Sequence, residues 1–180
     1  GIEGEAGPFQ GGITAFRNEI ENLIEPVFNY STGSGPSRVS YYTWENIAEA
    51  TTQGLEVEAL FHLPLNLTLS GHLTYMDTEN EETGDELEGR PDYKRSLKLA
   101  YAYTAWGLRA HLRMDHVGEM YYEDGNQSSY TLWNVYLAKQ WCDHFNVFIG
   151  VDNIFDTQET SDGVTYIEPA LYYAGFSIDY

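Results

Sequence analysis

The sequence has little positive charge, one cysteine and no long hydrophobic run, and each of these absences excludes a class of protein. Its 180 residues carry 9 lysines and arginines against 28 aspartates and glutamates, a net charge of −19. Phosphate recognition needs basic patches, so nucleic acid is excluded as a partner. No apolar stretch reaches the roughly 18 residues of a membrane-spanning helix. A lone cysteine, Cys142, allows neither an internal disulfide nor a cysteine-cluster metal site.

Apolar and polar residues alternate along most of the chain. Between Leu65 and Tyr75 every odd position except Gly71 is apolar and every even position is polar. Such alternation is typical of a strand with one apolar face and one polar face. The same pattern recurs in the segments 55–63, 96–103, 108–115, 133–138, 145–152 and 172–180.

The first strand fits this pattern less well. It is expected near residues 13–24, but Arg17, Glu19 and Glu21 share the parity of Ile13. With it, the sequence predicts an all-β antiparallel fold of eight fairly complete strands, preceded by the tail of an earlier strand at residues 1–6.

The predicted connections alternate between short and long. Short turns are expected near Gly7-Pro8, Leu63-Pro64, Ala105-Gly107 and Cys142-Asp143, and long polar loops over 25–41, 77–92, 118–129 and 156–169. Strands of about ten residues with short turns at one end and long loops at the other are typical of a transmembrane β-barrel. A soluble β-barrel with an aromatic core is the alternative, and it would leave these loop lengths unexplained.

Aromatic residues make up 15% of the chain, and many lie near predicted strand ends. Tyrosine and tryptophan favour the lipid–water boundary, where the ring and its polar tip meet different surroundings. We therefore predict membrane-interface aromatics at Trp44, Tyr75, Trp106, Trp141, Tyr172 and Tyr180. Four tyrosines of the outer loops fit either such a girdle or contact with a ligand, namely Tyr41, Tyr121, Tyr122 and Tyr166.

Four segments, in the right order and spacing, resemble the strands of TonB-dependent outer-membrane receptors. They are Tyr42–Glu58, Gly89-Arg90-Pro91, Gly150–Asp156, and Glu168-Pro169 followed by Tyr172-Tyr173. The chain departs from the family pattern at Ala48, where glycine is expected, at Ala170-Leu171 in place of Gly-Arg, and at Tyr180 in place of the commoner phenylalanine.

The resemblance implies that residues 1–180 are the C-terminal part of a larger barrel of about 22 strands in the bacterial outer membrane. It implies active uptake of a scarce ligand, of the iron-siderophore, haem or cobalamin class. The plug domain and the first part of the barrel would lie outside this chain. The implied partners are membrane lipid and lipopolysaccharide, the rest of the barrel, the plug, TonB through that plug, and a small-molecule ligand.

A basic patch is predicted on the lumen side of two neighbouring strands. A two-residue turn at Ala105-Trp106 would place Lys98 opposite Arg113 and Ala102 opposite Arg109. Like charges that face each other are unfavourable, so the patch needs an acidic partner. That partner is either local, at Asp115 or at glutamates such as Glu56 and Glu58, or it is the plug or an anionic ligand in transit.

No catalytic, metal or cofactor motif is present. The seven carboxylates of segment 77–88 lack the spacing of the known calcium loop, so a solvated outer loop is expected, and Ca²⁺ binding there stays open. Ser70 and His72 share a lumen face but form no triad, so we expect no enzymatic activity, although barrels that are hydrolases exist. The remaining alternative to uptake is a self-contained small outer-membrane barrel with a structural or adhesive role.

Overall fold

A computed structural model describes residues 1–122, 125–142, 144–158, 160–161, 164–165 and 167–178. The segments with alternating residues form strands, as predicted. The strands are β1 (Ile2–Ala6), β2 (Phe9–Thr32), β3 (Val39–Leu63), β4 (Leu67–Asn80), β5 (Tyr93–Tyr103), β6 (Leu108–Val117), β7 (Tyr130–Cys142), β8 (Phe145–Asp152), β9 (Thr160–Ser161), β10 (Val164–Thr165) and β11 (Leu171–Ile178). Among the described residues, no helix is both long and apolar enough to cross a membrane.

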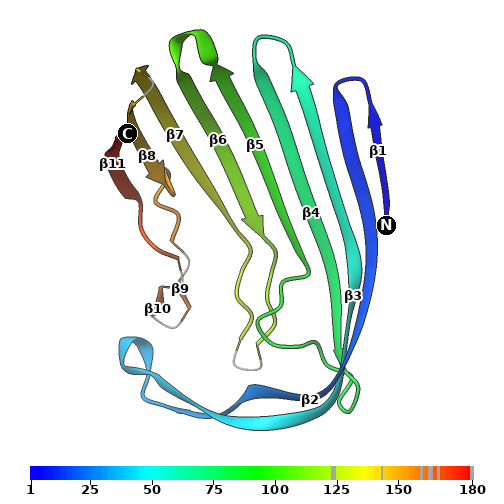
Figure 1. Cartoon of the computed structure of the whole chain (residues 1–180). Coiled ribbons are helices and arrows are strands. Elements are labelled where there is room, and N and C mark those ends of the chain that lie inside the picture. Colours follow the sequence, from blue (N-terminus) through cyan, green and yellow to red (C-terminus); the bar gives the residue numbers. More distant parts are fainter. Residues whose placement is uncertain (123–124, 143, 159, 162–163, 166, 179–180) are drawn as a thin grey trace.

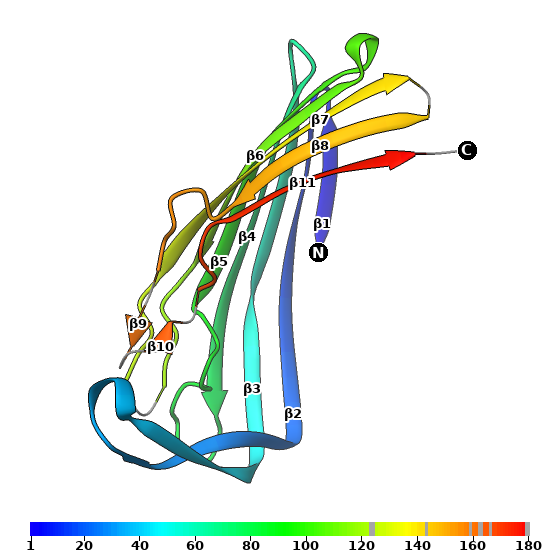
Figure 2. The ribbon, with the colours of Figure 1, turned by 90° about the vertical axis from the view of Figure 1, so that its left-hand side faces the viewer.

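Nine strands form one antiparallel sheet in which spatial order follows chain order, β1 through β8 and then β11. The short strands β9 and β10 pair separately. Figure 1 shows the large sheet as a curved wall, and Figure 2 shows β8 and β11 bending away from the plane of the central strands. Within the described residues β1 and β11 are the two edge strands and do not pair with each other, so the sheet does not close into a barrel.

The short turns lie at one end of the wall and the long connections at the other (Figure 1). The turn between β5 and β6 has four residues, 104–107, rather than the predicted two. Gly107 closes it with a φ of 60°, a conformation that glycine adopts without strain. Because the longer turn has the same centre, the predicted register is the observed one, and Lys98 pairs with Arg113.

The predicted loop over 25–41 is wrong. β2 and β3 remain paired as far as Thr32 and Val39, so the connection is only residues 33–38. Stacked rings support this two-stranded ribbon, since Tyr30 lies 4.8 Å from Tyr41 between ring centroids. The other long connections also shift, with β4 continuing to Asn80 and the last loop, 153–170, containing β9 and β10.

The ribbon leaves the wall and crosses below its long loops. β3 pairs with β4 only as far as Ala50 and Asn80, and beyond this point β2 and β3 pair only with each other. Asn22, just past this point, has a φ of 57°, which interrupts the regular extended backbone. Both ribbon views show the far end of the ribbon near the short strands β9 and β10 (Figures 1 and 2).

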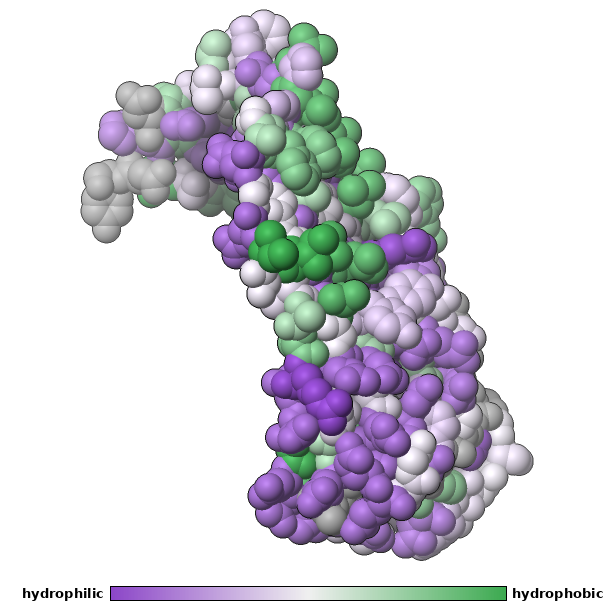
Figure 3. Space-filling model, turned by 90° about the vertical axis from the view of Figure 1, so that its right-hand side faces the viewer, coloured by the Kyte–Doolittle hydropathy of each residue, from purple (hydrophilic) through white to green (hydrophobic). Residues whose placement is uncertain are grey.

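The sheet has one apolar face, and no layer of described residues covers it. Among the described residues the buried hydrophobic side chains are only Ala50, Leu87, Ala138 and Ile167, whereas many large apolar side chains are exposed. Figure 3 shows hydrophobic surface gathered over the part of the wall near the short turns and hydrophilic surface over the ribbon end. The alternation thus produces a wall whose apolar face lacks a core to pack against.

A polar network marks the edge of the apolar face. Arg17 Nη1 donates to Gln53 Oε1 at 3.4 Å, and Gln53 Nε2 donates to Asp77 Oδ2 at 3.0 Å. Arg17 also forms a 3.1 Å salt bridge with Glu19. The charges that broke the alternation in the first strand therefore lie where that strand passes beyond the apolar band.

Candidate functional site

A groove lies at the long-loop end, between the ribbon and two connections. It has a volume of about 580 Å³ and is lined by Leu23, Ile24, Tyr42, Trp44, Glu88, Gly89, Arg90 and Tyr122. Trp44 is 71% exposed, so its indole is available to a molecule that enters the groove. Arg90 is held near its rim, where Nη1 donates to the Glu88 carbonyl at 3.2 Å.

Local backbone contacts bring the two connections together beneath the ribbon. The Gly89 amide donates to the Tyr121 carbonyl at 3.0 Å, and Gly89 has a φ of 68°. A Cβ at Gly89 would lie 3.2 Å from the Tyr122 hydroxyl oxygen, so glycine allows this tyrosine to approach closely. The result is a site with aromatic walls and both a cation and a carboxylate at its rim.

The structure distributes the predicted outer-loop aromatics over different places. Tyr122 lines the groove, whereas Tyr41 stacks on Tyr30 within the ribbon. Tyr121 accepts the Gly89 hydrogen bond through its carbonyl, and Tyr166 lies outside the described residues.

The predicted interface aromatics divide between the two ends of the strands. Trp44 lies on the ribbon and lines the groove, and Tyr75 pairs with Tyr93 at the long-loop end. Trp106, Trp141 and Tyr172 are exposed, at 68%, 68% and 72%, and Tyr180 lies outside the described residues. Their placement at a membrane interface stays a prediction.

The three basic residues predicted for the lumen lie on one face of β5 and β6. Lys98 is opposite Arg113, and Arg109 is opposite Ala102. Between them His111 stacks on Tyr136, with ring centroids 5.1 Å apart.

Part of this charge is neutralised locally. Arg113 forms a salt bridge with Asp115, with Nη2 and Oδ1 2.8 Å apart, and Arg109 Nη2 donates to Asn146 Oδ1 at 3.4 Å. Within the described part of the chain, Lys98 has neither a salt bridge nor a side-chain hydrogen bond. Because the Asn146 amide is uncharged, the patch retains two cations without a carboxylate partner among the described residues, Lys98 and Arg109.

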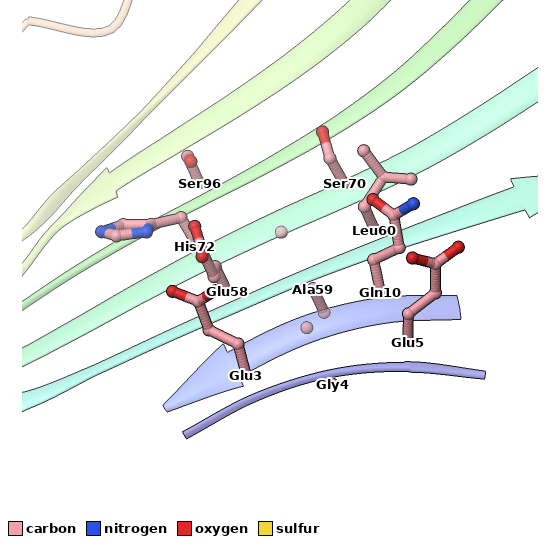
Figure 4. A pocket seen from close by; sticks show the side chains of 12 residues that line it. Glu3, Gly4, Glu5, Gln10, Glu58, Ala59, Leu60, Ser70, His72 and Ser96 are labelled. Carbon is pink, nitrogen blue, oxygen red and sulfur yellow. The ribbon is translucent and has the colours of Figure 1, made fainter. Parts of the chain in front are cut away.

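An acidic recess lies on the same face, on the other side of β4. It has a volume of about 660 Å³, and Figure 4 shows Glu3, Glu5 and Glu58 around it. A Cβ at Gly12 would lie 3.2 Å from Glu3 Cγ and 3.3 Å from Glu58 Oε1, so this glycine leaves room for both carboxylates. The polar face of the sheet is thus divided into an acidic part, with its glutamates on β1 and β3, and a basic part on β5–β6.

The recess contains Ser70 and His72 but not a catalytic pair. The Nε2 atom of His72 is 3.0 Å from Thr74 Oγ1, and no described hydrogen bond joins it to Ser70. Among the described residues, no three His, Cys, Asp or Glu side chains are placed to share a metal ion. In the acidic loop, Glu81 accepts a hydrogen bond from Thr51, and Asn80 caps the amides of Glu82 and Thr83.

The groove residues Leu23, Ile24 and Arg90 were not predicted as site residues. Arg90 belongs to the Gly89-Arg90-Pro91 segment, but its neighbour across the groove is about 46 positions away in sequence, at Trp44. Only the bend of the ribbon brings these positions together, and no local sequence pattern predicts that bend.

Comparison with known proteins agrees with this architecture. The chain is 31% identical over 174 residues to the ferric enterobactin receptor of Pseudomonas aeruginosa, which covers 87% of the chain and 23% of that protein. It is 28% identical to the ferrienterobactin receptor of Escherichia coli, covering 96% of the chain and 26% of that protein. The chain therefore spans about a quarter of the length of these relatives.

Solved structures show the same fold. A mutant of the P. aeruginosa ferric enterobactin receptor superposes with a TM-score of 0.73 at 25% identity, covering 98% of this chain and 29% of that one. The copper transporter OprC superposes with a TM-score of 0.78 at 16% identity, covering 98% and 29%, which shows the fold alone. The sequence model of the TonB dependent receptor-like β-barrel matches residues 1–154. An antiparallel wall with one apolar face, matched in this way over most of its length, belongs to the TonB-dependent receptor β-barrel family.

Proposed function

We propose that this chain forms part of the barrel wall and outer loops of an outer-membrane receptor that takes up an iron-siderophore. The match of the family over residues 1–154 carries the proposal, and the ferric enterobactin receptors among its relatives suggest the ligand class. Residues 1–180 are proposed as the C-terminal part of the barrel, with the plug and the preceding strands in the remainder of the receptor. TonB would act through that plug.

The two faces of the wall fit this role. The apolar face would contact membrane lipid and lipopolysaccharide, and the polar face would line the lumen. The aromatic groove lies at the long-loop end, where a ligand arriving from outside would first meet the protein. Transport of this kind needs no catalytic residue in the wall, and the receptor family consists of transporters.

Uptake of a radiolabelled ferric siderophore by cells tests the proposal. We expect uptake that requires the receptor gene and stops when TonB is deleted. Uptake unchanged by deletion of the receptor, together with an intact polypeptide near 20.5 kDa in the membrane, would favour the small structural or adhesive barrel instead.

Trp44→Ala should weaken binding of the ferric siderophore to the full-length receptor about tenfold, or roughly 1.4 kcal/mol. The physical reason is that an exposed indole on the groove wall supplies a large contact area for a ligand. Titration by intrinsic fluorescence measures the affinity. Trp106→Ala, at the short-turn end, is the matched control and should leave affinity unchanged; equal effects of both variants would remove the groove from the ligand path.

Lys98→Gln should lower the rate of siderophore uptake several-fold while leaving stability within about 0.5 kcal/mol of the parent. This follows if the uncompensated Lys98 meets an anionic ligand in transit. Arg113→Gln is the comparison, because Arg113 already pairs with Asp115 at 2.8 Å. If Lys98→Gln left uptake unchanged, Lys98 would not meet the ligand in transit.

A further inference from the structure

Arg95 is a cation on the apolar face of the wall. On β5 it lies between Leu73 of β4 and His116 of β6, and its neighbours two residues away are Tyr93 and Leu97. Since side chains alternate between faces along a strand, Arg95 shares its face with Leu97 and Leu99, whereas Lys94 points to the lumen side. This arginine therefore faces away from the basic patch described above.

Its depth can be placed along β5. The strand has 11 residues, and at about 3.3 Å each with a tilt near 45° it covers about 25 Å, the height of the apolar band of such barrels. Arg95 is two residues from Tyr93, the first residue of the strand at the long-loop end. Its flexible stem allows the guanidinium to reach the outer boundary of that band.

A fixed aromatic platform lies beneath the guanidinium. The Nδ1 atom of His116 is 2.8 Å from Thr131 Oγ1, and its Nε2 atom is 3.1 Å from the Tyr93 hydroxyl. The Tyr93 and His116 rings stack with centroids 5.4 Å apart, and Arg95 Cζ lies 5.9 Å from the Tyr93 centroid. Both imidazole nitrogens are thus engaged, and the tyrosine ring is held in place under Arg95.

The described residues give Arg95 no acceptor. Arg95 is exposed, and its contact within this part of the chain is the one with the Tyr93 ring, with neither a hydrogen bond nor a salt bridge. Asp77, on the same face of β4, has an Oδ2 that accepts from Gln53 at 3.0 Å. A guanidinium has five N–H donors, and leaving them without an acceptor at an apolar surface is costly.

An anion from the membrane would satisfy these donors. Guanidinium groups bind phosphate through two parallel hydrogen bonds, and stacking on an aromatic ring orients the fork. Because this face of the barrel meets lipid, the phosphate at this height belongs to a lipid headgroup. We propose that Arg95, supported by Tyr93, His116 and Thr131, forms a binding site for a phosphate-bearing headgroup of the outer leaflet. The inference rests on the proposed membrane placement but not on siderophore uptake.

Binding of bisphosphorylated lipid A to the full-length receptor in detergent tests this site, with native mass spectrometry measuring bound lipid. Arg95→Gln should weaken binding about tenfold, and Arg95→Lys should weaken it less, because the charge remains but the fork is lost. Lys94→Gln, one residue away on the opposite face, is the matched control and should bind as the parent does. Dephosphorylated lipid A should bind all variants equally.

Three results would overturn the proposal. Equal binding by Arg95→Gln and the parent would remove Arg95 from any lipid site. Competition by millimolar inorganic phosphate as effective as that by the lipid would indicate a free-anion site. A change in the oligomeric state of the receptor in Arg95→Gln, without loss of bound lipid, would indicate contact with a second copy.

If Arg95→Gln does not fold, the comparison of Arg95→Lys with Lys94→Gln decides whether the site exists. Loss of lipid binding by Arg95→Gln with normal siderophore uptake would support this site. Lipid binding by the parent receptor in the absence of siderophore uptake would contradict only the proposed function.

Discussion

Ile13→Arg is expected to lower the free energy of unfolding of the receptor by about 2–4 kcal/mol, the cost of a cation near the middle of a lipid-facing barrel wall. Ile13 is 55% exposed and pairs with Ile2 and Val57 on its two sides. It lies midway between Phe9, where β2 begins, and Arg17, where the polar edge begins. The arginine side chain is therefore too far from either boundary to escape the apolar band completely.

Thr14→Arg is the matched control, at the next position and on the opposite face. Thr14 pairs with Glu56, so a new arginine there gains a carboxylate neighbour in an aqueous lumen. Urea unfolding of the full-length receptor folded into phospholipid vesicles measures both variants. Equal losses would contradict the assignment of the two faces, since a one-residue shift should exchange lipid for lumen.

Gly54→Ala is expected to cost about 1–3 kcal/mol, the usual penalty for forcing extra volume into a close-packed site. A Cβ at Gly54 would overlap the Tyr75 carbonyl oxygen, and it would lie 2.9 Å from the Phe16 ring. The carbonyl belongs to the neighbouring strand β4 and cannot rotate away. The added methyl group must therefore push β3 and β4 apart.

Gly71→Ala separates this effect from the general consequences of removing a glycine. Gly71 lies in the interior of β4, where the closest atom to a new Cβ is Leu97 Cδ1 at 3.6 Å, an ordinary contact. Its alanine variant should be as stable as the parent or slightly more stable, because alanine loses less chain entropy on folding. A thermal or urea midpoint lowered equally in both variants would show that Gly54 is not sterically constrained.

Most strands of the wall could be predicted from the two-residue alternation of apolar and polar residues in the sequence. Where one face meets an apolar phase and the other meets water, alternation is enforced, and β4 to β8 and β11 carry it clearly. The register of β5 on β6 was also predicted correctly from the sequence. The centre of a tight turn fixes which residues pair, whether that turn contains two residues or four.

The ribbon and the groove could not be predicted from the sequence. Beyond Arg17 the strands β2 and β3 pass out of the apolar band, so nothing enforces alternation, and Glu19 and Glu21 occupy the same parity as the apolar Ile13 and Ala15. The groove depends further on the bend near Asn22 and on contacts between the ribbon and two connections far along the chain. Such juxtapositions arise from tertiary packing, which a local pattern does not contain.

The length of the ribbon is set by strand pairing alone, whereas the length of the other long strands is set by strand pairing and by the apolar layer that they would cross. In the proposed placement, the thickness of the membrane limits the length of β4 to β8. Past Ala50 and Ile20, in contrast, the two strands of the ribbon pair only with each other. Adding or removing two residues in each would preserve both its register and its alternation of faces. In the proposed receptor, the length of the ribbon and the side chains that it presents at the long-loop end can therefore change in evolution without altering the strands that would span the bilayer.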